Sequence, residues 1–199
     1  GTTPTIDTAS KTLRVNGVLL ASTTNTRGLT IGANANDGTL TAGTAGGELF
    51  LINNSANTLT VNAAIANNTS ASLVSKFGSG NATFAGTNTY TGATSLKGGI
   101  ITAANSSAFS NGAVTILPTT TRLVINDGLT LANNITFKGG GTSSRGVFEN
   151  SGSGEATLSG TITIDGVLAG GGHFASVSTG TLKVTGPVNS AAQPVSCRL

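Results

Sequence analysis

The chain has 199 residues, of which 9% are charged and 4% aromatic, with 29 glycines and a formal net charge of +3 at pH 7. Freely diffusing enzymes usually carry roughly a quarter of their residues as charged side chains, so this composition argues against that class. Leu, Ile and Val recur at regular intervals along the whole chain, which excludes a disordered low-complexity protein. The sequence therefore predicts a folded chain whose solubility depends on hydroxyl and amide groups.

Short strands separated by tight turns are predicted throughout the N-terminal half. Asn16-Gly17 is a strong hairpin-type turn signal, and Asp37-Gly38 and Asn53-Asn54 mark further turns. No window shows apolar residues at the three- and four-residue spacing of a helix. The predicted strands fall within residues 12–22, 28–32, 39–43, 48–52 and 58–65.

The C-terminal half repeats this pattern and again predicts only strands. Thr161 and Thr181 open matching strands about one repeat length apart. The expected strands lie within residues 71–77, 82–85, 86–101, 113–117, 122–125, 129–131, 135–137, 147–149, 156–158, 161–164 and 181–184.

Approximate repeats of roughly 20 residues, each too small to bury its own apolar face, are typical of a β-solenoid. We therefore predict an all-β chain that forms a right-handed parallel β-helix of about nine or ten coils. Alternation within strands would place Leu, Ile and Val inward, and Thr, Ser and Lys outward. The Asn-Asn and Asn-Gly pairs would lie at the corners. A β-sandwich is the structural alternative, although sandwiches usually bury more large aromatic side chains than this chain has.

Residues 1–199 are expected to form a single solenoid module. The chain begins with Gly1 and contains no Met, which favours a processed product or a piece of a longer repetitive chain.

One stretch resembles the autotransporter-associated β-strand repeat, also called the passenger-associated transport repeat, of surface proteins of Gram-negative bacteria. The residues that carry the resemblance are Lys76-Phe77-Gly78-Ser79-Gly80-Asn81-Ala82-Thr83-Phe84-Ala85-Gly86-Thr87-Asn88-Thr89-Tyr90-Thr91-Gly92, then Gly98-Gly99-Ile100-Ile101 and Asn111-Gly112-Ala113-Val114-Thr115-Ile116. The similarity is clearest over residues 73–140. Ala93 stands where the family often has a second Gly, and Ile100-Ile101 where Thr-Leu is usual.

The resemblance implies a right-handed parallel β-helix on the outside of the cell, as a passenger or stalk. It brings no catalytic residues, because the family has none to carry over. Its repeat is thought to aid folding during secretion.

An enzyme built on a β-helix would need two or three carboxylates, or carboxylates with Arg or Lys, converging on neighbouring coils. The seven acidic residues are spread along the chain, and the nearest pair in sequence is Glu149 and Glu155. The seven are Asp7, Asp37, Glu48, Asp127, Glu149, Glu155 and Asp165. We therefore expect no catalytic residues.

His173 and Cys197 are the other candidates for chemistry. His173 follows three glycines and has no second His or acidic cluster near it in the sequence, so we interpret it as a loop histidine. Cys197 is the one cysteine, so no internal disulfide can form, and we assign it no role. The serial Gly-Gly-x-Gly-x-Asp repeats of calcium-binding β-rolls are absent from the sequence. We expect no cofactor and no metal.

Tyr90, the only tyrosine, could stack on a sugar ring, but its place in a repeat motif favours a packing or corner role. Thr-x-Thr pairs raise the alternative of a flat hydroxyl array like that of ice-binding solenoids. The pairs are not in constant register, which favours ordinary β-propensity. They are Thr39/Thr41, Thr58/Thr60, Thr87/Thr89/Thr91 and Thr161/Thr163.

The expected partners follow from the predicted rod. Basic residues are scattered singly, whereas nucleic-acid binding requires clusters, and no apolar run approaches the length of a transmembrane helix. Open strand edges at both ends favour end-to-end stacking with neighbouring modules or identical protomers, and hence filaments. The sequence thus predicts an extracellular, non-enzymatic adhesive or structural module. The alternative is a polysaccharide-binding or polysaccharide-degrading β-helix that contacts surface glycans.

Overall fold

The computed structural model describes residues 2–21, 27–117, 120–138, 146–166, 174–177 and 179–190, and for residues 175–177 it describes the backbone alone. These residues form 22 strands and no helix. Every pairing between named strands is parallel. The all-β prediction is therefore confirmed, and the β-sandwich alternative is excluded, since its strands would pair antiparallel.

The strands form two long sheets and a third, interrupted face. The first sheet contains β1 (Thr5–Ile6), β4 (Leu29–Ile31), β7 (Leu59–Val61), β10 (Ala82–Phe84), β12 (Ile100–Ala103), β14 (Arg122–Ile125), β17 (Phe148–Asn150) and β20 (Ala175–Val177). The second sheet contains β3 (Gly17–Leu20), β6 (Glu48–Asn53), β9 (Leu73–Phe77), β11 (Thr94–Lys97), β13 (Val114–Ile116), β16 (Ile135–Phe137), β19 (Ile162–Ile164) and β22 (Val188–Ser190). The third face contains β2 (Thr12–Val15), β5 (Thr39–Ala42) and β8 (Ala64–Ala66), and separately β15 (Thr130–Leu131), β18 (Glu155–Leu158) and β21 (Thr181–Val184).

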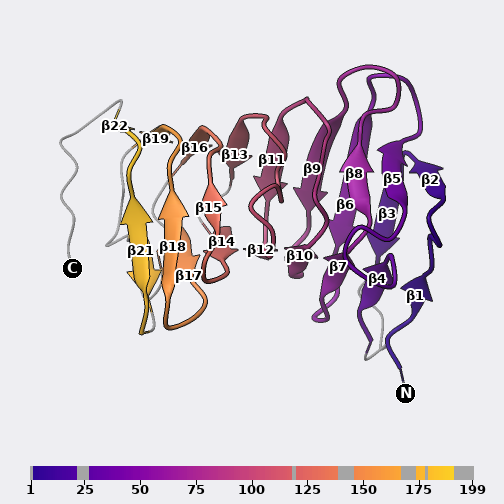
Figure 1. Ribbon diagram of the computed structural model, residues 1–199, viewed down its shortest axis with the longest axis horizontal. Coiled ribbons are helices and arrows are strands. Elements are labelled where there is room, and N and C mark those ends of the chain that lie inside the picture. Colours follow the sequence, from indigo (N-terminus) through magenta and orange to yellow (C-terminus); the bar gives the residue numbers. More distant parts are fainter. Residues whose placement is uncertain are drawn as a thin grey trace.

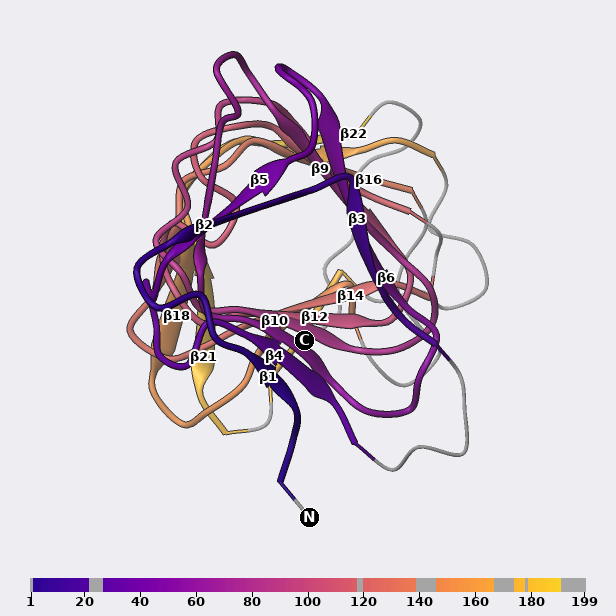
Figure 2. The same cartoon turned by 90° about the vertical axis from the view of Figure 1, so that its right-hand side faces the viewer.

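Each turn of the chain visits the first sheet, the third face and the second sheet in that order, and then begins the next coil. Figure 1 shows the coils side by side along the long axis, with β1 at one end and β22 at the other. In Figure 2 the N-terminal end faces the viewer, and the chain runs clockwise as it recedes. The β-helix is therefore right-handed, as predicted.

The described residues form eight coils, since each long sheet contains eight strands. The predicted count of nine or ten is not confirmed. The coils vary in length: the register partners Ala82 and Ile101 bound a short coil, whereas Leu29 and Leu59 bound a much longer one. The expected period holds only for the shortest coils, because others contain longer loops between strands.

The fourth coil (β10, β11) and the fifth coil (β12, β13) cross the third face without a strand, which divides that face into two three-stranded sheets. In the fourth coil the crossing segment includes Asn88 and Tyr90, which are buried. In the clearest stretch of the repeat motif, buried side chains therefore hold the third face, and no β-ladder forms there.

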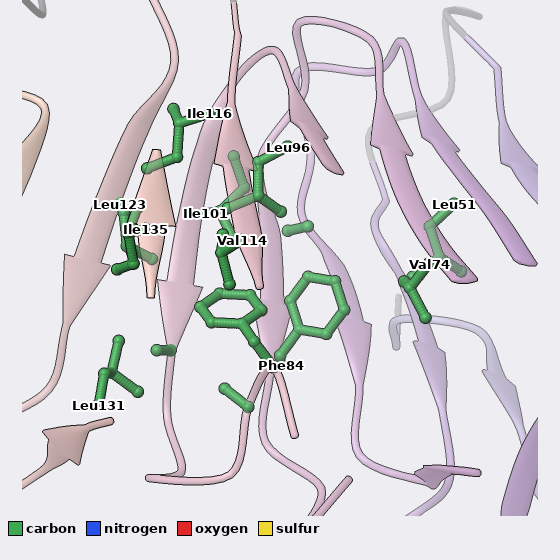
Figure 3. Close-up of a cluster of buried hydrophobic side chains, with 14 of the residues drawn as sticks. Leu51, Val74, Phe84, Leu96, Ile101, Val114, Ile116, Leu123, Leu131 and Ile135 are labelled. Carbon is green, nitrogen blue, oxygen red and sulfur yellow. The ribbon is translucent and has the colours of Figure 1, made fainter. Parts of the chain in front are cut away.

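Apolar side chains fill the inside of the coils in columns. Strands such as β7, β10 and β13 bury their first and third residues and leave the middle one half-buried. Figure 3 shows Phe84, Leu96, Ile101 and Val114 pointing into the interior from successive strands. Because buried residues such as Phe84 have buried register partners in the coils before and after them, stacking makes the continuous core that no single coil could form.

Asparagines lie at the corners, as predicted. Asn53 ends β6, and Asn133 lies between β15 and β16. Both are buried, and their side-chain amides donate to backbone carbonyls: Asn53 to Asn57 and Asn81, and Asn133 to Phe109, Ser110 and Gly112. The bond from Asn53 to Asn57 stays within one corner, whereas the others reach the neighbouring coil. Corner asparagines therefore tie neighbouring coils together.

Candidate functional site

The seven carboxylates all lie within the described residues, and they are dispersed over the rod. Three of them pair with a basic residue in the neighbouring coil: Glu149 with Arg122, Glu155 with Lys183 and Asp165 with Lys138. Glu48 accepts a hydrogen bond from Ser75 Oγ. The remaining three, Asp7, Asp37 and Asp127, accept hydrogen bonds from backbone amides of turns.

Glu149 and Glu155, the nearest acidic pair in the sequence, lie on different faces of the coil, in β17 and β18. General acid–base cleavage of a glycosidic bond needs two carboxyl groups that flank the bond from facing positions. These two carboxylates instead contact Arg122 and Lys183. Each therefore takes part in an ion pair between coils, and the two do not line one face as a catalytic pair would.

Other candidates for chemistry give no site in the described part of the chain. Within these ranges, no three His, Cys, Asp or Glu residues gather closely enough to hold a metal ion, and no helix is long and apolar enough to cross a lipid bilayer. His173 and Cys197 lie outside the described residues.

Tyr90 is fully buried, so it offers no face to a sugar ring. Its hydroxyl lies 2.5 Å from Thr94 Oγ1, which is also buried. Burial raises the pKa of Tyr90 above its usual value, and the hydrogen bond with Thr94 opposes that shift. The structure therefore gives Tyr90 the packing role that its place in the repeat motif favoured.

The Thr-x-Thr pairs do not form one surface. Thr39 and Thr41 lie on the third face, Thr58 and Thr60 at the first sheet, and Thr161 and Thr163 at the second sheet. The structure does contain single columns of hydroxyl side chains that sequence reasoning missed. One column on the first sheet runs through Thr5, Thr30, Thr60, Thr83 and Thr102 in register. A single column lacks the second row of hydroxyls that a Thr-x-Thr array requires.

An aromatic pair on the outer surface of the second sheet was also missed. Phe50 and Phe77 lie in adjacent strands, both half-buried, with ring centroids 6.1 Å apart. Lys97 Nζ lies 4.6 Å from the centroid of the Phe77 ring, which is a cation–π contact. Leu19 of β3 and Leu73 of β9, exposed to 60% and 41%, belong to the same sheet, on either side of β6. We call Leu19, Phe50, Leu73, Phe77 and Lys97 the aromatic strip.

Lys76 corrects the expectation that lysines point outward. Its side chain is fully buried, in register with Leu51 of β6 and Leu96 of β11, both of which are core residues. The ammonium group donates to the carbonyl oxygens of Gly78 (2.6 Å), Gly98 (2.7 Å) and Gly80. Desolvation by burial lowers the pKa of Lys76 to about 8. The alternation of β9 itself predicts this inward position, because Val74, two residues earlier, is also buried.

Comparison with known proteins gives a partial match. Over 95 residues, which are 47% of this chain, the sequence is 40% identical to the adhesin BmaC autotransporter of Brucella suis biovar 1 (strain 1330). The matched stretch is 3% of the length of that protein. No protein-family model matches the chain, and no solved structure matches it. Nearly half of this chain is therefore similar to a short part of an autotransporter adhesin.

Proposed function

We propose that the chain is an extracellular structural and adhesive module of a bacterial surface or secreted repeat protein, comparable to the passenger stalk of an autotransporter. The observation that carries this proposal is the 40% identity to an autotransporter adhesin. The fold supports it, because a right-handed parallel β-helix is what the resemblance to the autotransporter-associated β-strand repeat implied. Residues 73–140 are the part that we assign to this repeat, on the pattern of their residues alone.

A β-helix suits a stalk for a physical reason. Each coil is bonded to the next along two long sheets and through corner asparagines, so the stack resists bending without a second domain to support it. The ion pairs between coils, such as Arg122 with Glu149, add to this coupling. The module would therefore hold an adhesive surface at a fixed distance from the cell.

An adhesion assay tests the proposal directly. Beads coated with the purified chain should bind to host-cell layers more than beads coated with an unrelated β-rich protein of similar net charge. Soluble chain added in excess should compete for this binding. Coated beads that bind no better than control beads would contradict the adhesive part of the proposal.

End-to-end stacking is the second part of the proposal. Inward side chains of the first coil are only half-buried, whereas their register partners in the second coil are fully buried. The pairs are Leu13 with Leu40, Val15 with Ala42 and Val18 with Leu51. Leu182 and Val184 of the last described coil are likewise half-buried. A further coil with the same cross-section would bury these side chains and pair with the strand edges.

Sedimentation velocity at increasing protein concentration tests this stacking. We expect the sedimentation coefficient to rise with concentration, and a Leu13→Glu variant to reduce the rise, because a charge would be buried at the junction. A variant with the same change at exposed Leu19 is the matched control. Protein that remains monomeric at the highest concentration would contradict stacking between identical protomers.

A polysaccharide-binding β-helix is the alternative, and the aromatic strip is the observation that favours it. Half-exposed phenylalanine rings offer apolar faces that can pack against the C–H groups of a sugar ring. A glycan array probed with the chain should then give saturable binding that a Phe50→Ala, Phe77→Ala variant loses. Release of reducing ends from a bound glycan would favour the degrading form of this alternative.

A further inference from the structure

The Lys76 ammonium lies at the centre of a three-carbonyl cradle, which we define as the backbone oxygens of Gly78, Gly80 and Gly98. A protonated lysine has three N–H donors and no acceptor, and the cradle supplies one acceptor for each donor. The side chain is fully buried. The match between donors and acceptors is therefore complete without water.

The cradle spans two successive corners of the β-helix. Gly78 and Gly80 lie in the turn from β9 to β10, which opens the fourth coil, and Gly98 lies in the turn from β11 to β12, which opens the fifth coil. Lys76 itself belongs to β9 in the third coil. Its ammonium thus joins a strand to the turn that follows it and to the equivalent turn one coil later.

Both turns have a backbone shape that only glycine adopts without strain. Gly78, Gly98 and Gly99 have φ angles of 85°, 122° and 78°. A Cβ atom on Gly99 would lie 2.9 Å from Lys76 Nζ, and one on Gly98 would lie 2.7 Å from the Gly78 oxygen. The two turns are therefore packed against each other and against the ammonium, with no room for a side chain.

Core packing alone does not explain a lysine at this position. The register partners on either side are Leu51 and Leu96, so a leucine would continue the apolar column at no desolvation cost. A buried ammonium is expensive unless its hydrogen bonds are satisfied. What the lysine adds is a group that satisfies three carbonyls that point into the interior at this corner.

We propose that Lys76 serves as a tethered internal cation that fixes the conformation of two successive corner turns and so couples neighbouring coils at this corner. Coils in a solenoid are usually coupled only to their nearest neighbours. Lys76 adds a side-chain link of this kind, because Gly98 follows β11, the strand that pairs with β9. The cradle is complete once the turns after β9 and after β11 have both folded around the ammonium.

Hydrogen–deuterium exchange in a Lys76→Met variant tests this role, because methionine keeps the apolar stem and removes the donors. Two amides report on the turns: Gly80, which donates to Asn53 O, and Ile100, which donates to Asn81 Oδ1. Their exchange should speed up by roughly 10- to 100-fold, since buried carbonyls lose charged donors. The Thr157 amide in β18 of the seventh coil, which donates to Leu129 O, lies far from the cradle, and its exchange should not change.

A Lys97→Met variant is the matched control. Lys97 lies on the neighbouring strand, but its ammonium is outside, over the Phe77 ring. This variant should leave the exchange of Gly80 and Ile100 unchanged. Unchanged exchange at both amides in Lys76→Met would overturn the proposal, and so would equal acceleration in the two variants.

Chemical rescue separates hydrogen-bond donation from charge. In a Lys76→Ala variant, added n-propylammonium should restore slow exchange at Gly80 and Ile100, because it supplies three donors on a short apolar chain. Tetramethylammonium at the same concentration has the charge without the donors and should not restore it. Equal rescue by both ions would overturn the proposal.

If the variants do not fold, the wild-type chain still decides the matter. At pH 7 the ¹⁵N-labelled Lys76 ammonium should give a resolved NMR signal whose protons exchange slowly with water, since each is bonded to a carbonyl. A fast-exchanging or neutral Lys76 amine in the folded chain would overturn the proposal.

Discussion

Buried polar side chains hold successive coils of this β-helix together at the level of single residues. Asn88 accepts from the Ile65 amide one coil back and donates to Ala108 O one coil ahead. Asn68 donates to Ala42 O. A buried carbonyl without a hydrogen-bond partner lowers the stability of the fold by about 1–3 kcal/mol. Each such side-chain amide therefore both pairs with a buried carbonyl at a corner and fixes the register between coils.

Tyr90 offers a direct measure of what one such hydrogen bond contributes. We expect Tyr90→Phe to lower the free energy of unfolding by about 1–2 kcal/mol, because the buried Thr94 hydroxyl loses its partner. The measurement is denaturant unfolding followed by circular dichroism.

Thr94→Val provides the control for Tyr90→Phe. The double variant should recover part of the loss, since two apolar groups of matching shape leave no unpaired donor. A Tyr90→Phe variant as stable as the wild type would contradict the buried hydrogen bond.

Because Lys76 is buried, we predict that the free energy of unfolding increases with pH. Burial lowers its pKa from 10.5 in the unfolded chain to about 8 in the folded one. Between these values the unfolded chain binds more protons than the folded chain, so stability rises with pH. The penalty for burying the charge is fully present below pH 8 and is lost as the pH rises toward 10.5.

The measurement is the difference in free energy of unfolding between wild type and Lys76→Met from pH 7 to pH 11. We expect the wild type to gain on the order of 3 kcal/mol relative to the variant. The strands packed against β9 carry Glu48 and Lys97, both outside the core. Both are present in the wild type and in the variant, so the difference between the two proteins reports on Lys76. A difference that falls as the pH rises would contradict the lowered pKa.

For single residues, the sequence predicts the positions of the corner asparagines better than it predicts the inward position of Lys76. Asn53-Asn54 and Asn133-Asn134 are turn signals that depend on local backbone preferences, and the structure places both at corners. The packing role of Tyr90 followed from its place in a motif. Lys76 was wrongly expected outside, because a general preference of lysine for solvent was given more weight than its alternation with buried Val74. The carbonyl cradle depends on contacts between coils, which local sequence patterns do not record.

At the scale of elements, the inner columns carry the stability and the outer surface adds little. Phe84 of β10 is fully buried and packs against Phe109 with ring centroids 5.6 Å apart. Phe77 of β9 lies outside and is half-buried, and it contacts Phe50 and Lys97. The same residue type thus occupies both sides of the coil wall.

This pair of phenylalanines gives a matched test of which side is the core. Phe84→Ala should lower the free energy of unfolding by about 3–5 kcal/mol, as expected for a large cavity in a packed interior. Phe77→Ala should cost markedly less, because water already reaches its ring. Both values come from denaturant unfolding, and equal losses in the two variants would contradict the assignment of inner and outer faces.

Strands and turns were predictable from sequence because alternation and Gly or Asn punctuation are local signals. The lengths of the coils were not. The long coil between Leu29 and Leu59 includes loops, and the spacing of apolar residues in the strands does not predict the length of a loop. The missing strand on the third face in the fourth coil was also hidden, because Asn88-Thr89-Tyr90-Thr91 has the β-branched character of a strand and nevertheless packs through Asn88 and Tyr90.

At the scale of the whole molecule, eight coils form a rod with a continuous core in the described residues. The carboxylates are dispersed along it, in ion pairs, in turns and, for Glu48, in a hydrogen bond from Ser75. The half-buried side chains of the first coil, such as Val15, lie at one end of the rod and those of the last coil, such as Val184, at the other. These features fit the proposed module, which would act by its length and by the surface that it presents. That residues 1–199 form one module of a longer chain stays a prediction.

Labelling of intact source cells with antibodies against this chain tests its proposed place at the cell surface most directly. We predict that intact cells are labelled, that external protease removes the label, and that the labelled protein is far larger than the 19.4 kDa of this chain. Labelling that appears only after the cells are permeabilised would contradict a surface module.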